Sequence, residues 1–71
     1  MRLRQIFAAN LRARRNAKGL SQEDLADLAE IDRTYVSLLE RCEYSASLDV
    51  VERIAVALNV DPSELLTSPA K

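Results

Sequence analysis

Four helix-start signals divide this chain into short segments and constrain its fold more than any other feature of the sequence. Ser21, Asp32, Ser47 and Asp61 each stand immediately before an apolar pattern with helical spacing. Serine and aspartate at such positions accept hydrogen bonds from the unpaired N–H groups of a helix's first turn. The last signal is strengthened by Pro62, because proline is well suited to the first helical position. The pattern predicts an all-α fold built from short helices.

Five helices are expected, and the first of them ends at Gly19, a residue that favours helix termination. The expected helices cover about residues 3–18, 21–29, 32–41, 47–58 and 61–66, and residues 67–71 are expected to form a frayed tail. Their apolar stripes are expected to contain Leu3, Phe7 and Leu11, then Leu25, Leu28 and Ala29, then Val36 and Leu39, then Leu48, Val51, Ile54, Ala55 and Leu58. Residues 1–71 contain no repeat or linker and are interpreted as one domain.

The charge of the chain is unevenly distributed along its length. The net charge is −1, but residues 1–19 carry six basic residues and no acidic one, whereas residues 20–71 carry four basic and all 11 acidic residues. A protein that binds nucleic acid needs a local basic face rather than a basic total. The alternative is a solvated amphipathic helix beside an acidic body, and charge alone does not decide between the two.

Several function classes are excluded by residues that the chain lacks. It contains no His and a single cysteine, Cys42, which excludes a zinc site and the Cys–His and Ser–His–Asp arrangements of hydrolases. It also contains no glycine-rich phosphate loop. We therefore expect no enzyme activity, no catalytic residues, no metal, no cofactor and no small-molecule ligand.

The same reasoning predicts where the protein works. No apolar run approaches the roughly 20 residues that a membrane span requires, and the first residues lack the apolar core of a signal peptide. A lone cysteine cannot form an internal disulfide, which fits a reducing compartment. We expect a cytoplasmic protein that does not associate with membranes.

The segment with the clearest functional meaning is residues 21–41, where two short helices are joined by a turn of about three residues. Ile31 in that turn is expected to fill the angle between the helices. At about 100° per residue, Val36 and Leu39 face inward. The opposite face is expected to hold Thr34, Ser37, Leu38 and Arg41, with Arg33 and Tyr35 on its flanks. Such a face can read base edges, because arginine suits guanine and threonine or leucine can contact a thymine methyl group; the alternative is a plain solvated face.

A family resemblance rests on Leu20-Ser21-Gln22-Glu23-Asp24-Leu25-Ala26, Ile31-Asp32-Arg33-Thr34-Tyr35-Val36-Ser37, Leu39-Glu40-Arg41, Ser47-Leu48-Asp49 and Ala55-Val56-Ala57-Leu58-Asn59-Val60. Together these stretches resemble the Cro/repressor type of helix-turn-helix protein over about residues 5–66. The stretch from Ile31 to Tyr35 is similar to the controller proteins of restriction–modification systems. The resemblance implies a five-helix DNA-binding domain whose third helix lies in the major groove of double-stranded DNA.

The resemblance also implies roles for individual residues. Gln22 is expected to contact phosphate at a helix N-terminus, which attracts anions, and Ser21 either caps that helix or contacts phosphate. Arg33, Thr34 and Ser37 are expected to contact bases. Tyr35 is expected to contact the DNA backbone or a base edge, and Leu38 stands where relatives often have a polar residue that reads a base. Arg41 is expected either to contact phosphate or to be a surface charge. Arg15 is expected to form a structural ion pair with Glu40.

Two departures from the family pattern concern backbone conformation. The family usually has glycine where this chain has Glu30 and Cys42, and both positions favour left-handed backbone. That conformation costs a residue other than glycine about 1 kcal/mol or more. The loop after the third helix, residues 43–46, also lacks the family's usual basic residue, so its phosphate contacts are in doubt.

The C-terminal part of the chain has more apolar residues than we expect one subunit to bury, which predicts a dimer joined through residues 50–66. The expected interface residues are Val50, Val56, Val60, Leu65 and Leu66. A two-fold dimer would place two recognition helices about 34 Å apart on a palindromic operator.

Two alternatives to a sequence-specific regulator remain open. One is an antitoxin-type interaction module with autoregulatory DNA binding, for which residues 67–71 leave little room. The other is a non-specific architectural protein, which the net charge disfavours.

Overall fold

The computed structural model describes residues 2–68 and contains five helices and, within those residues, no strand. The helices are α1 (Arg2–Ala17), α2 (Gln22–Ala29), α3 (Arg33–Glu40), α4 (Leu48–Leu58) and α5 (Pro62–Leu66). The predicted all-α, five-helix fold is therefore confirmed, with each helix boundary within about one residue of its expected place. None of the helices among these residues combines the length and the apolar character that crossing a bilayer requires.

The helix starts are fixed by the residues that the sequence singled out. The Ser21 hydroxyl accepts a hydrogen bond from the Asp24 N–H at 2.9 Å, and the Asp24 carboxylate accepts one from the Ser21 N–H at 3.1 Å. Asp61 and Glu64 form the same reciprocal box at the start of α5. Because each box satisfies N–H groups that a helix leaves unpaired, the position of the start is encoded locally.

Three helices are followed, within two residues of their ends, by a residue other than glycine in the left-handed region. Glu30, Cys42 and Asn59 have φ angles of 60°, 62° and 59°. In each case the next N–H reaches a carbonyl five residues back, as when Ile31 donates to Ala26 at 2.9 Å. The left-handed backbone expected at Glu30 and Cys42 is confirmed, whereas Asn59 was not anticipated. Asparagine tolerates this conformation better than most residues do.

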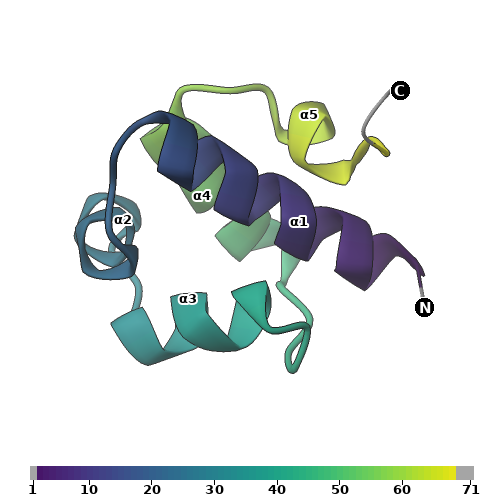
Figure 1. The fold of residues 1–71 in the computed structure, drawn as a ribbon, viewed down its shortest axis with the longest axis horizontal. Coiled ribbons are helices and arrows are strands. Elements are labelled where there is room, and N and C mark those ends of the chain that lie inside the picture. Colours follow the sequence, from purple (N-terminus) through teal and green to yellow (C-terminus); the bar gives the residue numbers. More distant parts are fainter. Residues whose placement is uncertain (1, 69–71) are drawn as a thin grey trace.

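The core is formed by side chains from all five helices. Its fully buried members are Leu11, Leu25, Val36, Leu39, Ile54, Leu58 and Leu65. Ile31 packs against this core from the turn between α2 and α3, as expected. Figure 1 shows α3 along the lower edge of the molecule and α5 at the opposite edge, with α1 crossing between them. This arrangement leaves one long side of α3 uncovered by other helices.

Four positions correct the expectations from the sequence. Leu28 and Leu48, expected in the apolar stripes, are 58% and 83% exposed, and Leu3 is 44% exposed. On α2 the small Ala26 is buried instead, because α2 turns that face toward α4. Leu65, expected at a dimer interface, is 0% exposed. The short α5 folds back on α1 and α4 and buries Leu65 within one subunit, so Leu65 has no surface for a partner.

Candidate nucleic-acid interface

The exposed side of α3 begins at a well-defined helix start. The Asp32 carboxylate accepts a hydrogen bond from the Thr34 N–H at 2.9 Å. Arg33 and Thr34 follow directly and are exposed, whereas Val36 is buried. Two of the three sequence-predicted base readers, Arg33 and Thr34, therefore stand at the N-terminal end of the helix with their side chains in solvent.

The rest of this face is less open than its N-terminal end. Tyr35, Ser37 and Leu38 are half-buried, and Arg41 is exposed just after the last turn of α3. The Arg41 guanidinium lies 3.4 Å from the Glu43 carboxylate. This exposed pair partly offsets the positive charge that Arg41 would present to an anion.

The C-terminal end of α3 is fastened through Glu40, which is 5% exposed. Arg15 of α1 pairs with the Glu40 carboxylate through two hydrogen bonds, from Nε to Oε2 at 2.6 Å and from Nη2 to Oε1 at 3.0 Å. Gln22 of α2 donates from Nε2 to Oε1 of the same carboxylate at 3.0 Å. Arg12 donates to the Glu40 carbonyl oxygen at 3.2 Å. We call these four residues the Glu40 cluster.

The Glu40 cluster favours the charged form of Arg15. Hydrogen bonding to Glu40 raises the pKa of Arg15 above its ordinary value, against the opposing effect of burial. Arg15 also donates to the Leu20 carbonyl oxygen at 2.8 Å. A bidentate arginine–carboxylate pair holds both partners in one geometry. The cluster therefore fixes α3 relative to α1 and α2.

Gln22 and Ser21 lie at the N-terminal end of α2, where the family resemblance implies contacts with DNA phosphate. Gln22 is half-buried, and its amide nitrogen, which carries two N–H groups, directs one of them to Glu40. Ser21 uses its hydroxyl as the helix cap. Sequence reasoning placed Gln22 at the interface but missed its bond to Glu40, because nothing in a linear sequence relates these two positions.

The sequence also did not predict the contacts of two further residues, Tyr44 and Asn10. Tyr44, in the loop after α3, has its ring edge-to-face with that of Tyr35, with 5.8 Å between the ring centroids and 86° between the ring planes. Asn10 donates from Nδ2 to the carbonyl oxygens of Leu65 and Thr67, both at 2.9 Å, and thereby holds α5 against α1. The available signals were a lone aromatic residue in a polar loop and a polar residue inside an apolar helix pattern.

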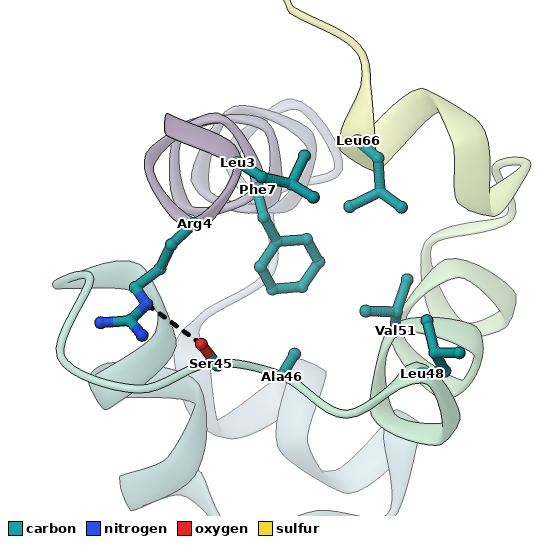
Figure 2. A pocket seen from close by; sticks show the side chains of 8 residues that line it. All are labelled: Leu3, Arg4, Phe7, Ser45, Ala46, Leu48, Val51 and Leu66. Carbon is teal, nitrogen blue, oxygen red and sulfur yellow. Dashed lines mark hydrogen bonds between the residues drawn. The ribbon is translucent and has the colours of Figure 1, made fainter. Parts of the chain in front are cut away.

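A hollow of about 210 Å³ opens between the first turns of α1, the loop at Ser45 and Ala46, α4 and α5. Its lining is Leu3, Arg4, Phe7, Ser45, Ala46, Leu48, Val51 and Leu66. Figure 2 shows the apolar side chains of α1, α4 and α5 around it, with the hydrogen bond from Arg4 Nε to Ser45 Oγ, 3.1 Å long, at its rim. We call this feature the apolar hollow. One of its eight lining residues is charged.

A second groove lies between α2 and α4. It is lined by Leu28, Ala29, Glu30, Glu52, Arg53 and Val56. Val56, expected at a dimer interface, is therefore on a different surface from Leu66, and three of the six lining residues here are charged. The remaining expected interface residues, Val50 and Val60, are half-buried and packed against the core.

Comparison with known proteins explains this arrangement. A protein-family model for the helix-turn-helix matches residues 11–65. The chain belongs to the helix-turn-helix family. It is 45% identical over 67 residues to a hypothetical transcription factor of Neisseria meningitidis serogroup B, covering 94% of this chain and 63% of that protein. It is 40% identical over 67 residues to the control protein C.SmaI of Serratia marcescens, covering 94% of this chain and 80% of that protein.

Solved structures agree. The restriction–modification controller protein C.AhdI of Aeromonas hydrophila is 45% identical and superposes with a TM-score of 0.85, covering 87% of this chain and 94% of that one. The resemblance inferred from the sequence, including its similarity to controller proteins, is confirmed. The chain thus has the Cro-like fold of helix-turn-helix transcription regulators, and α2 and α3 are its motif.

Proposed function

We propose that this chain regulates transcription by binding specific sequences in double-stranded DNA, with α3 in the major groove. The observation that carries the proposal is the uncovered side of α3, which presents Arg33 and Thr34 while the Glu40 cluster holds the helix in place. Preorganised side chains on a rigid helix are what base reading requires, because a mobile reader loses discrimination between bases.

The proposed contacts fall into two kinds. Arg33, Thr34 and Ser37 read base edges, with arginine suited to guanine and the threonine methyl suited to thymine. Tyr35 meets the backbone or a base edge and Leu38 makes apolar contact. Gln22, Ser21 and the N-terminus of α2 position the protein on phosphate, where unpaired N–H groups and the helix dipole favour anions. Arg41 adds a phosphate contact weakened by Glu43.

We further propose that the protein acts as a homodimer and that a second copy of the chain covers the apolar hollow. Leu48 is 83% exposed beside this hollow, so each copy offers both a projecting leucine and a cavity. A two-fold contact needs such a self-complementary surface. The groove at Val56 fits a second copy less well, because charged residues make up half of its lining.

Selection of bound duplexes from a random DNA pool tests the function. The proposal predicts enrichment of one sequence that occurs as two inverted half-sites, with centres about 34 Å or one helical turn apart. Enrichment of nothing above the starting pool would overturn specific binding. Enrichment of a single, unpaired half-site would retain base reading by α3 but overturn the dimer.

A further inference from the structure

The chain has two tyrosines, and the fold brings their rings into contact beside α3. Tyr35 is half-buried on α3, and Tyr44 lies nine residues later in the loop. Their ring centroids are 5.8 Å apart with the planes at 86°. Edge-to-face geometry places the positive edge of one ring against the negative face of the other, which is the favoured arrangement for aromatic pairs.

The backbone on both sides of Tyr44 is anchored. Cys42, with its left-handed φ of 62°, reverses the chain after α3, and the Glu43 N–H then donates to the Leu38 carbonyl at 2.9 Å. On the other side, the Ser45 hydroxyl accepts a hydrogen bond from Arg4 Nε at 3.1 Å. The loop is thus fixed at both ends, so the position of the Tyr44 ring is set by the fold rather than by chance packing.

Burial does not explain why a tyrosine stands at this position. Tyr44 is 56% exposed, and it contributes nothing to the buried core. The loop around it, residues 43–46, contains the acid Glu43 and no basic residue, so it offers no positive charge to phosphate. What the loop does place beside α3 is an aromatic ring against Tyr35.

We propose that Tyr44 is a positioning residue for DNA recognition, which holds the ring of Tyr35 in one orientation so that the Tyr35 hydroxyl is presented to the operator. This inference rests on the proposed function of α3. The Tyr44 ring acts through Tyr35 and not through its own hydroxyl. The aromatic contact is the part of the tyrosine that matters, since a ring edge or face is what restrains the neighbouring ring.

A double-mutant cycle on the operator from the selection experiment tests the proposal. Tyr44→Ala is expected to weaken operator binding about two- to tenfold, the range that corresponds to one lost aromatic pair. Tyr44→Phe is expected to bind as the wild type does, because the ring contact is retained. In a Tyr35→Ala background, Tyr44→Ala is expected to cost nothing further.

Two outcomes would overturn the proposal. If Tyr44→Phe loses as much affinity as Tyr44→Ala, the Tyr44 hydroxyl contacts DNA directly. If Tyr44→Ala costs the same with and without Tyr35, the two residues act independently. Tyr44→Leu, which keeps an apolar side chain in the loop but lacks the ring, serves as a second variant and is expected to behave like Tyr44→Ala.

A readout without DNA separates this inference from the proposed function. In NMR spectra of the free protein, Tyr44→Ala is expected to shift the Tyr35 ring resonances. Glu43→Ala removes an exposed side chain next to Tyr44 but keeps the Glu43 N–H that anchors the loop, and it is expected to leave the Tyr35 signals nearly unchanged. Unchanged Tyr35 signals in the Tyr44→Ala protein would overturn the positioning role even if operator binding were confirmed. Failure of the wild type to select any sequence would instead overturn the proposed function.

Discussion

The Glu40 cluster and the apolar hollow differ in how completely their side chains are satisfied within one subunit. In the cluster the buried carboxylate of Glu40 is met by donors from α1 and α2, and among the described residues no buried side-chain nitrogen or oxygen lacks a partner. In the hollow, apolar side chains from three helices line a cavity that stays open, and Leu48 projects into solvent.

The difference follows from the free-energy cost of an unpaired buried charge, which is larger than the cost of exposed apolar surface. An unpaired buried charge is so unfavourable that the subunit must supply its partners itself. Exposed apolar surface lacks only the favourable free energy of burial, and contact with a second copy can supply that burial. The cluster thus orients α3 within one subunit, and the hollow is the surface through which we propose that two subunits meet.

The largest expected effect is on the cluster. Glu40→Ala leaves the Arg15 guanidinium largely buried without its carboxylate, and breaking a buried pair in this way destabilises by about 3–5 kcal/mol. The free energy of unfolding, measured with urea, checks the prediction. Glu43→Ala, which removes an exposed carboxylate paired with Arg41, is the control and is expected to cost less than about 1 kcal/mol. If the Glu40→Ala protein kept full stability and only its DNA affinity changed, the prediction that the cluster stabilises the fold would be wrong.

The next effect is on the hollow. Leu48→Glu places a charge where a second copy is proposed to dock, while the exposed side chain leaves the subunit fold intact. We expect a monomer that binds the full operator about a hundredfold or more weakly, since the second half-site is no longer tethered to the first, and binds a half-site as before. Electrophoretic mobility shift on both DNAs measures this.

Val56→Glu is the matched control for the hollow, because Val56 is also exposed but lies in the groove between α2 and α4. The Val56→Glu protein is expected to remain dimeric. The reverse result, a monomeric Val56→Glu protein and a dimeric Leu48→Glu protein, would move the interface to that groove.

Arg33 separates base reading from both regions, because it belongs to neither. Arg33→Ala is expected to cost about 1–3 kcal/mol on the operator and to relax specificity at one base pair, without the loss of stability expected for Glu40→Ala. Arg14→Ala, which removes an exposed arginine paired with Glu64 of α5 at 2.7 Å, is the control. An equal loss on operator and random DNA would argue against base reading by Arg33.

The smallest effects concern helix ends. Glu30→Gly is expected to stabilise the fold by about 1 kcal/mol, because glycine adopts the left-handed region without the penalty of a side chain. Asn59→Gly is expected to gain less, since asparagine already tolerates that region. Thermal denaturation of the two variants measures the difference, and a destabilised Glu30→Gly protein would show that the position stores no strain.

The helix starts could be predicted because their chemistry is local. Ser21 and Asp61 satisfy N–H groups within three residues of themselves, so the sequence alone locates the boundaries. The inward face of α3 was predicted for the same reason, since Val36 and Leu39 stand three residues apart and Thr34 and Ser37 then point outward, with Arg33 on the flank.

The choice between neighbouring apolar residues could not be predicted in this way. Leu25 and Leu28 lie only about 60° apart around a helix, so periodicity admits both to the core. The position of α4 decides between them, with Leu25 buried and Leu28 exposed. The burial of Leu65 and the contact between Tyr35 and Tyr44 likewise depend on how distant segments meet, which no spacing along the chain reveals.

Sedimentation of the wild-type protein, alone at micromolar concentration and with its selected operator, shows whether two copies of the chain assemble to bind DNA. We expect a dimer in solution and two chains on each full operator, one α3 for each half-site, because a second copy is proposed to cover the apolar hollow. A protein that is monomeric in solution and still binds one full operator tightly as a single chain would contradict the account.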